Sequence, residues 1–323
     1  MKLLQVCNVA TRVGGTGACA WTIARCLPDW EHVFAFPVRN VPDGVAEDFG
    51  HPCVALPQVR AGDIERLGAD AVLWHNSSPY RMPQACPPGV RSLYYQHSAH
   101  SACIEARRRC ETVWCVSRYL AGLAHLPEES VVYQPVPEPP KAGGQRQEPP
   151  TIGRLCTPTA AKWNVDVLVP FYRRLAERHP EVLWRFVGAS AAAEHGLRAV
   201  LHDNADFLPP SWDARTWLWS WWAVLYTGPP ETYGRVVCEA QRARCVPIVD
   251  DAGGFREQIV DGETGFLCRN FDAFDAAIER MLSTGVNWDT MQASGANRGS
   301  LNAWRNRFLA WLGGANGRQL RAA

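Results

Sequence analysis

Short apolar runs alternate with helical patterns along the first half of the chain. Apolar runs of strand length lie at residues 3–6, 33–36, 71–74, 93–95, 113–116 and 131–133. Apolar side chains recur at helical spacing over residues 18–26, 64–67, 103–110 and 119–126. Because strands that alternate with helices form parallel sheets covered on both faces, this half predicts one α/β domain.

The second half repeats the alternation after a break. Residues 135–150 are rich in proline, glycine, glutamine and glutamate, which predicts a linker. Strands are then predicted at residues 151–153, 183–187, 224–227 and 246–249, and helices at 165–178, 191–201, 216–220 and 274–282. A last amphipathic segment, 301–312, carries Trp304, Phe308 and Trp311, which predicts a helix with a broad packing face.

Length and composition agree with two globular domains. The chain has 323 residues, 47% of them hydrophobic and 20% charged, which suits two domains of about 150 residues. The net charge of +1 provides no general attraction to nucleic acid or an anionic membrane. No apolar run is long enough for a transmembrane helix. The apolar start of the chain is soon interrupted by Asn8 and Arg12, so no signal peptide and a cytoplasmic location are expected.

The twelve cysteines are spread over the chain without paired CxxC motifs. They are expected to be reduced core residues rather than a disulfide framework. One stretch does contain side chains that zinc accepts as ligands: His97, His100, Cys103, Cys110 and Cys115. Their loose spacing and the apolar run around Cys115 favour packing, so no metal site is predicted.

The most distinctive polar motif lies at residues 229–240, PPETYGRVVCEA. Glu231 and Glu239 stand eight positions apart, and Gly234 between them opens a predicted helix. Free backbone N–H groups at a helix start bind phosphate, and a glycine lets the phosphate approach closely. Carboxylates on either side are suited to hydroxyl groups. The pattern therefore suits a nucleotide-sugar, although a solvated helix start with two incidental acids is the alternative.

This motif resembles the E-x7-E signature of glycosyltransferase family 4, whose members are retaining enzymes with the GT-B fold. The resemblance continues through residues 245–249, 253–257 and 261–267, and upstream to 152–155 with Lys162. It covers most of residues 151–270 and is thinner over 1–140. Two positions depart from the family pattern where glycine is usual: Trp163 after Lys162, and Pro209 near the base pocket.

The resemblance implies an α/β protein of the GT-B type, with two Rossmann-like domains facing a central cleft. Residues 1–136 would form the acceptor-side domain, 137–150 the linker and 151–300 the donor-binding domain. Residues 301–323 would contain a helix that crosses back to the first domain.

The same resemblance assigns roles around the donor. Arg154 and Lys162 would neutralise the diphosphate, a task that arginine and lysine perform well. Glu231 would hold hydroxyls of the transferred sugar and Glu239 those of the ribose. The segment between them would present backbone donors to sugar and phosphate; its residues are Thr232, Tyr233, Gly234, Arg235 and Val236.

The first half contributes a glycine loop and two histidines. Gly14 and Gly15 lie in a loop that loosely matches a dinucleotide fingerprint. The glycines stand too far from the first strand, and the end of the second strand lacks an acid, which argues against NAD. The loop would instead face the diphosphate or acceptor, or be a simple turn. His97 resembles the family histidine that contacts donor sugar and phosphate, while for His75 packing and cleft positions stay open.

The predicted function is transfer of a hexose from a nucleotide-diphosphate sugar, most simply a UDP-sugar, with retention of configuration and without a metal or other cofactor. The acceptor is open among small molecules, glycans, peptides and modified nucleic-acid bases. The alternatives are a non-catalytic nucleotide-sugar-binding module and another GT-B enzyme of epimerase or phosphorylase type. The sequence does not indicate the oligomeric state. It also does not indicate whether the tryptophan-rich segment 212–222 lines a cleft, although core packing is favoured.

Overall fold

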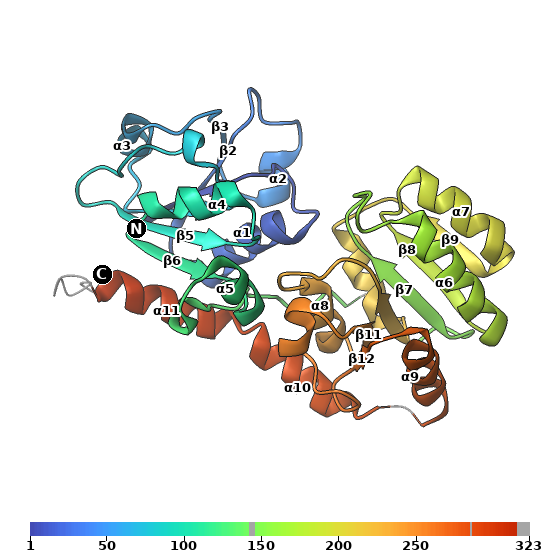
Figure 1. Cartoon of the computed structure of the whole chain (residues 1–323). Helices are drawn as coiled ribbons and strands as arrows, with labels where there is room; N and C mark the ends of the chain where they lie inside the picture. The colour runs from blue at the N-terminus through green and yellow to red at the C-terminus, as the bar shows by residue number, and fades with distance from the viewer. Residues whose placement is uncertain (142–145, 285, 315–323) are drawn as a thin grey trace. The chain divides into compact units, whose positions relative to one another are not determined.

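The computed structural model describes residues 1–141, 146–284 and 286–314. The chain divides into two compact units, one formed by Met1–Val136 with the segment from Ser300 onward, and the other by Pro137–Gly299. Each unit contains one parallel six-stranded sheet (Figure 1). The alternating strands and helices of each half therefore form the two Rossmann-like sheets that the sequence predicts.

In the first unit the sheet has the strand order β3-β2-β1-β4-β5-β6. The strands are β1 (Lys2–Cys7), β2 (Glu31–Phe36), β3 (Cys53–Ala55), β4 (Ala71–His75), β5 (Arg91–Gln96) and β6 (Thr112–Cys115). Its inner strands are mostly apolar and buried, as expected of a parallel sheet covered on both faces, and Gln5 in β1 is a buried polar exception.

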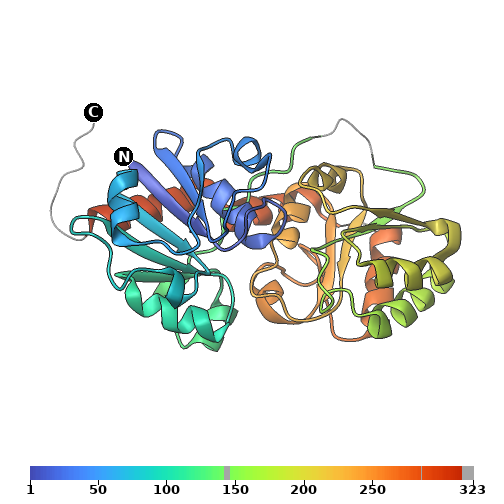
Figure 2. The same cartoon turned by 90° about the horizontal axis from the view of Figure 1, so that it is seen from above.

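Helices cover both faces of this sheet. On one face lie α1 (Gly15–Cys26), α2 (Val45–Phe49) and α11 (Leu301–Gly313). On the other lie α3 (Ala61–Leu67) and α4 (Ser101–Ala106). A further helix, α5 (Arg118–Ala124), follows β6. Figure 2 shows α11, in red, and the green helices on opposite sides of the strands.

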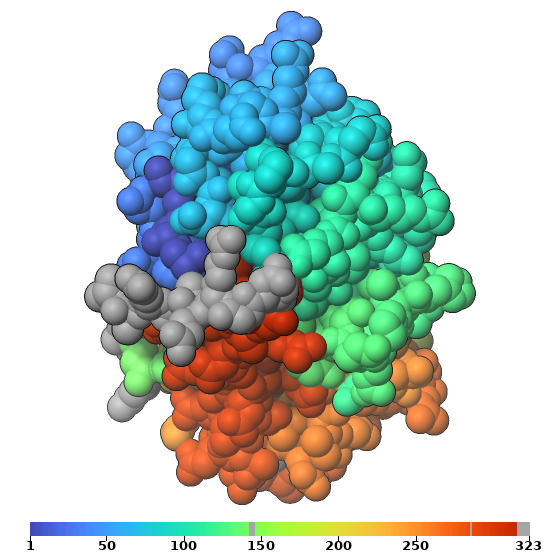
Figure 3. Space-filling view, turned by 90° about the vertical axis from the view of Figure 1, so that its left-hand side faces the viewer, coloured from blue at the N-terminus to red at the C-terminus, as the bar shows by residue number. Residues whose placement is uncertain are grey.

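The last helix belongs to the first unit because of its aromatic face. Trp304 and Phe308 are buried, and their ring centroids lie 6.0 Å and 6.4 Å from that of Trp114. The indole N–H of Trp311 donates to Thr112 at 2.9 Å. The other side of α11 forms part of the red surface in Figure 3.

In the second unit the strand order is β12-β11-β10-β7-β8-β9. The strands are β7 (Thr151–Leu155), β8 (Leu183–Val187), β9 (Ala205–Leu208), β10 (Ala223–Tyr226), β11 (Val246–Asp250) and β12 (Phe266–Cys268). Both sheets, counted from the first strand of each unit, have the order 3-2-1-4-5-6 of doubly wound folds. The order reverses between β1 and β4 and between β7 and β10, where such folds bind ligands.

The helices of this unit also lie on both faces of its sheet. The large core cluster joins the strands to α6 (Val165–Arg178), α7 (Ala191–Leu201) and α9 (Phe271–Ser283). Opposite lie α8 (Arg235–Arg242) and the 3-10 segment η5 (Asp213–Trp219). Against α8 packs α10 (Trp288–Arg298), where Gly295 leaves room for the close contact.

The differences from the predicted elements lie mainly at sheet edges and in two helices that the sequence does not indicate, α2 and α10. Residues 131–133 form no strand, since Val131 makes only an isolated bridge to Cys115. The strands β3, β9 and β12, which the sequence does not indicate, are all edge strands of three or four residues. A strand of three or four residues is too short for its hydrophobic pattern to stand out from the sequence around it. The predicted helix at 216–220 is the 3-10 segment η5.

All twelve cysteines lie in described residues, and none forms a disulfide. Most of them are buried, as expected of reduced core residues. Within the described part of the chain, no helix combines the length and apolar character needed to cross a membrane.

Candidate active site

The second unit gathers the predicted donor-site residues at the carboxyl ends of its central strands. Arg154 lies on β7 and Lys162 in the loop after it, while Glu231 lies in the loop after β10. These two strands flank the point where the strand order reverses. The fold thus brings together three residues that are up to 77 positions apart in the sequence (231 − 154), at the place where doubly wound sheets bind ligands.

Glu231 is held by two neighbours from the same unit. The Lys162 ammonium lies 2.5 Å from Glu231 Oε1, and the two side chains are 28% and 20% exposed. The hydroxyl of Tyr226 donates to the same oxygen at 3.1 Å. Burial and the nearby carboxylate raise the pKa of Tyr226, so its hydroxyl stays protonated. Sequence reasoning missed Tyr226, because an aromatic residue inside a predicted strand indicates packing.

Arg154 is a buried residue, with an exposed fraction of 1%. One guanidinium nitrogen, Nη2, donates to the carbonyls of Lys162 at 2.6 Å and Thr227 at 3.0 Å. Its Cζ lies 5.0 Å from the ring of Trp163 and 4.7 Å from that of Tyr226. The departure from the family glycine at Trp163 therefore provides an aromatic ring against this arginine.

Two donors of Arg154 have no hydrogen-bond partner within the described residues, Nε and Nη1. Buried polar groups almost always have partners, so each exception needs an explanation. Both nitrogens are shut off from solvent, and the buried Tyr172 hydroxyl lies beside the guanidinium, so a bound anion would reach these two donors only after a local rearrangement. Direct contact between Arg154 and a phosphate remains a prediction.

The start of α8 is held by the neighbouring 3-10 segment η6 (Gly253–Glu257). Gly234 has a φ of +78°, and a Cβ there would lie 2.2 Å from the ring of Phe255. The backbone N–H of Gly254 donates to the carbonyl of Glu231 at 2.8 Å. The side-chain amide of Gln258 donates to the carbonyl of Tyr233. The backbone from Glu231 to Gly234 is therefore held in place by Gly254, Phe255 and Gln258.

The remaining residues of this segment differ in burial. Thr232 and Val236 are half-buried, whereas Tyr233 and Arg235 are buried. Val236 packs with the cluster under η5. Contact of these residues with a donor stays a prediction.

Glu239 is buried in α8 between two arginines. Its Oε1 lies 3.0 Å from Arg215 Nε and 3.5 Å from Arg235 Nε, and the residue is 2% exposed. Burial alone would raise the pKa of Glu239, but Arg215 and Arg235 outweigh it, so the pKa lies below its usual value. The carboxylate is thus ionised, and its predicted binding to ribose hydroxyls would take place beside Arg215. Arg215 stands in a tryptophan-rich segment, and no sequence signal pairs it with Glu239.

Asp250, at the end of β11, holds the loop before Glu231. It accepts from the Gly228 N–H at 2.7 Å and from the Thr227 hydroxyl at 3.1 Å. Burial raises the pKa of Asp250, partly opposed by these two hydrogen bonds. Sequence reasoning ended the strand at residue 249 and did not consider this aspartate.

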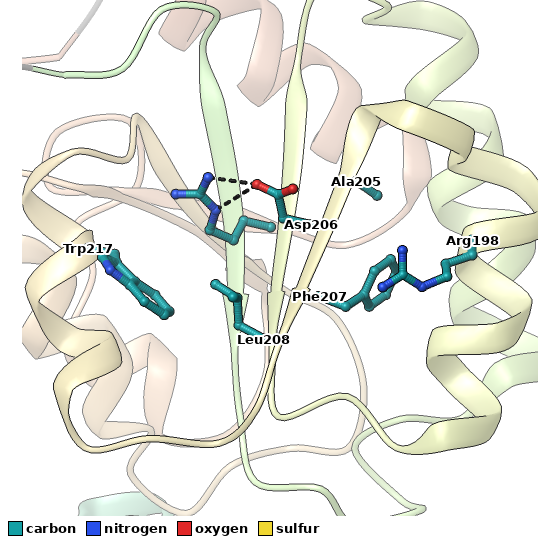
Figure 4. A pocket seen from close by; sticks show the side chains of 7 residues that line it. Arg198, Ala205, Asp206, Phe207, Leu208 and Trp217 are labelled. Carbon is teal, nitrogen blue, oxygen red and sulfur yellow. Dashed lines mark hydrogen bonds and ion pairs between the residues drawn. The ribbon is translucent and has the colours of Figure 1, made fainter.

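A shallow hollow lies along the edge strand β9 (Figure 4). It is lined by Arg185, Arg198, Ala205, Asp206, Phe207, Leu208 and Trp217. Arg185 and Asp206 are paired neighbours on β8 and β9, and their side chains form an ion pair at 2.7 Å. Phe207 and Leu208 directly precede Pro209, the departure near the family's base pocket. In the tryptophan segment, Trp221 is fully buried and fills the space above Gly153, as core packing predicts.

The glycine loop of the first unit forms the start of α1. Gly14 is the N-cap residue with a φ of +106°, a conformation that favours glycine, and Gly15 is the first helical residue. The carbonyl of Gly14 accepts from the Ala18 N–H at 3.1 Å. The expected contact of this loop with a diphosphate or acceptor stays a prediction.

The histidines of the first unit lie together. His75 ends β4 and His97 follows β5, and both are buried. Ligand atoms of Cys19, His75 and His97 all lie within 4.8 Å of one another, the one such group of metal-ligating types in the described residues. Of the zinc candidates considered from the sequence, His97 alone belongs to this group. His100 instead caps α4, accepting from the Ala102 N–H.

Comparison with known proteins identifies the second unit most clearly. Residues 159–297 match the family model described as "Glycosyl transferases group 1". A comparison with curated protein sequences gives no significant match.

Solved structures match along nearly the whole chain. Alr3699/HepE from Anabaena, solved in complex with UDP and glucose, has 16% identity and a TM-score of 0.74, covering 97% of this chain and 100% of that one. WaaG, a glycosyltransferase involved in lipopolysaccharide biosynthesis, has 12% identity and a TM-score of 0.69, with coverage of 97% and 100%. AviGT4, a glycosyltransferase involved in avilamycin A biosynthesis, has 15% identity and a TM-score of 0.66, with coverage of 98% and 99%.

The chain has the two-domain GT-B fold of these structures. Together with the match to the group 1 family model, this fold supports the conclusion that the protein is a glycosyltransferase.

Proposed function

We propose that this glycosyltransferase transfers a hexose from a UDP-sugar to an acceptor with retention of configuration, without a metal ion. One observation carries the proposal: Arg154, Lys162 and Glu231 meet at the carboxyl ends of β7 and β10, where the strand order reverses. An anion attached to a polyhydroxyl group would match both the cations and the carboxylate. The UDP and UDP-glucose complexes of the structurally similar HepE support UDP as the nucleotide.

Breaking the sugar–phosphate bond leaves negative charge on the nucleoside diphosphate, which the protein must stabilise. Arg154 is preorganised for this, because Lys162 and Thr227 carbonyls hold one edge of its guanidinium. Lys162 would exchange its contact with Glu231 for the diphosphate. Glu231, still oriented by the Tyr226 hydroxyl, would then accept from hydroxyls of the sugar.

The other proposed contacts complete the donor site. Backbone N–H groups at the start of α8 would bind phosphate, helped by the helix dipole. Glu239 would accept from the ribose, and His97 would contact the sugar on the evidence of the family resemblance. The acceptor oxygen would attack the same face from which the diphosphate leaves, and the leaving phosphate would take the acceptor's proton. The acceptor class and the cytoplasmic location remain predictions from the sequence.

Thermal unfolding with nucleotides tests the donor. A ligand that binds only the native state raises the melting temperature. UDP and one or more UDP-sugars should raise it in the presence of EDTA, whereas ADP and GDP at the same concentration should raise it less. No shift with any nucleotide would remove the proposal, and a shift that requires a divalent ion would remove its metal independence.

Catalysis and stereochemistry need a second measurement. Slow hydrolysis of the UDP-sugar that binds should release UDP and a free sugar. Proton NMR of the product, recorded before mutarotation, should show the anomeric configuration of the donor. Release of the opposite anomer would contradict retention, and binding without turnover in the presence of an acceptor library would favour the non-catalytic module.

A further inference from the structure

A continuous chain of hydrogen bonds runs through the two buried histidines of the first unit. Gln5 Oε1 lies 3.1 Å from His75 Nε2, and His75 Nδ1 lies 3.0 Å from His97 Nε2. His97 Nδ1 in turn lies 2.8 Å from Gln134 Nε2. Both ring nitrogens of both imidazoles are thus used within one unit.

The two glutamines give this chain a direction. An amide oxygen only accepts and an amide nitrogen only donates. With Oε1 of Gln5 facing His75, the proton of His75 must be on Nε2, which leaves a lone pair on Nδ1. His97 then donates its Nε2–H to His75 and accepts at Nδ1 from Gln134. The reverse order would require both amides to turn over together.

Burial keeps His75 neutral. The side chain is fully buried, and desolvation lowers the pKa of His75 to about 3. Its ring packs 5.2 Å from that of His97 and 6.1 Å from that of Tyr95, measured between centroids. The backbone of His97 is also fixed, since its N–H donates to Asn76 Oδ1 at 2.8 Å. Asn76 has a φ of +49°, which asparagine adopts more readily than most residues.

We propose that His75 is a positioning residue that holds His97 as the neutral Nε2–H tautomer. In this form the unprotonated Nδ1 of His97 can accept from a hydroxyl of the transferred sugar once Gln134 gives way. His97 then acts as a hydrogen-bond acceptor, not as a cation for phosphate. This inference rests on the proposed function, in which His97 contacts the donor sugar.

The tautomer can be measured without any assay of activity. Long-range ¹H–¹⁵N correlation spectra of the histidine side chains distinguish a protonated ring nitrogen from a bare one. We expect His97 to show a protonated Nε2 and a bare Nδ1 throughout the neutral pH range, and His75 to show the same pattern. Because this uses the unaltered protein, the inference stays testable even if variants unfold.

Two variants of His75 separate positioning from packing. His75→Asn keeps an acceptor near the place of Nδ1, whereas His75→Leu fills space without one. In His75→Leu the Nε2–H of His97 loses its acceptor, so the Gln134 amide becomes free to turn over and accept from Nδ1. We expect a mixture of the two His97 tautomers and a kcat/KM for the donor about tenfold lower, the scale of one lost buried hydrogen bond. His75→Asn should retain the tautomer and most of kcat/KM. The control His195→Leu, at an exposed position on α7, should change neither.

Other outcomes overturn the inference. A His97 with the proton on Nδ1, or one that is doubly protonated at neutral pH, contradicts the assigned direction. One equivalent of zinc in the purified protein, lost in Cys19→Ala, shows that the facing nitrogens are metal ligands instead. The predicted tautomer in a protein that binds no nucleotide-sugar would instead leave the geometry intact and remove the proposed function.

Discussion

The Lys162 ammonium and the Tyr226 hydroxyl meet at the same carboxylate oxygen of Glu231, at 2.5 Å and 3.1 Å. The cation comes from the loop after β7 and the hydroxyl from β10, so the pair joins the two strands where the sheet order reverses. Lys162 therefore has a contact that it would give up when a diphosphate arrives.

Replacing Lys162 by methionine tests this exchange. Lys162→Met should lower turnover of the UDP-sugar at least about 100-fold, the cost of losing one preorganised charge at a reacting centre. The melting temperature should change little, because a partly exposed ion pair contributes about 1 kcal/mol or less. The matched control is Lys141→Met, since Lys141 is an exposed lysine of the same unit. Steady-state kinetics and thermal melts suffice, and unchanged turnover would remove Lys162 from the site.

Replacing Glu231 by glutamine separates sugar binding from nucleotide binding. Glu231→Gln keeps the size of the side chain. It removes the negative charge that strengthens hydrogen bonds from sugar hydroxyls, and it replaces one acceptor oxygen by an NH2 group. Turnover should fall about 100-fold, whereas the affinity for UDP, measured by calorimetry, should be retained. The control Glu177→Gln changes an exposed glutamate of α6. Equal loss of affinity for UDP and UDP-sugar would place Glu231 on the nucleotide instead.

Arg154 should matter to both stability and donor binding. A lysine keeps its charge but lacks the planar fork that reaches two carbonyls and an anion together. Arg154→Lys should reduce the free energy of unfolding by about 1–3 kcal/mol, because a buried carbonyl would lose its partner. It should also weaken UDP binding about tenfold or more. Urea unfolding and UDP titration measure the two effects, and full UDP affinity would exclude a phosphate contact.

Glu239 should make stability depend on acidity. Its pKa in the folded protein is lowered by Arg215 and Arg235 despite burial. The stabilisation is therefore complete above the unfolded pKa of about 4.3. It is lost as the pH falls through the lower folded value.

In Glu239→Gln the two arginines lose their buried counter-charge at every pH. The free energy of unfolding should fall by about 3–5 kcal/mol at neutral pH. The gap from the unaltered protein should then narrow on acidification below pH about 4. Urea unfolding between pH 3 and about 7 measures both, and a gap that stays constant would contradict the ion-pair assignment.

Gly234 should not accept a side chain. In Gly234→Ala the methyl group would collide with the ring of Phe255 and occupy a left-handed conformation, which costs about 1–2 kcal/mol before the clash is counted. Thermal melts should show a lower melting temperature and weaker UDP binding. Gly122→Ala is the control, because Gly122 is an exposed helical glycine with nothing within 4 Å of its added Cβ. It should be neutral or stabilising by up to about 1 kcal/mol.

The strands of the core could be predicted because burial on both faces gives them continuous apolar runs. Residues 71–74 and 246–249 are examples, and they lie in β4 and β11. The edge strands β3, β9 and β12 could not, because three or four residues are too few to show a distinctive pattern.

Some residues of the candidate site could be predicted from the sequence, and others could not. Glu231, Gly234 and Glu239 stand within nine consecutive positions (231–239), and helix geometry alone orders them along α8 and its start. Tyr226 and Arg215 were not found. Tyr226 resembles a packing residue of a strand, and Arg215 reaches Glu239 from a segment 24 positions earlier (239 − 215).

The sequence by itself determined the two α/β halves, the glycine at the start of α8 and the spacing of its two carboxylates, because each depends on neighbours within one or two turns of chain. The tertiary structure decided which polar side chains meet: Lys162 with Glu231, Arg215 with Glu239, and His75 with His97. The partners of each pair come from different elements of the chain, and only the order of the strands and the packing of helices on the sheet bring their side chains within hydrogen-bond distance.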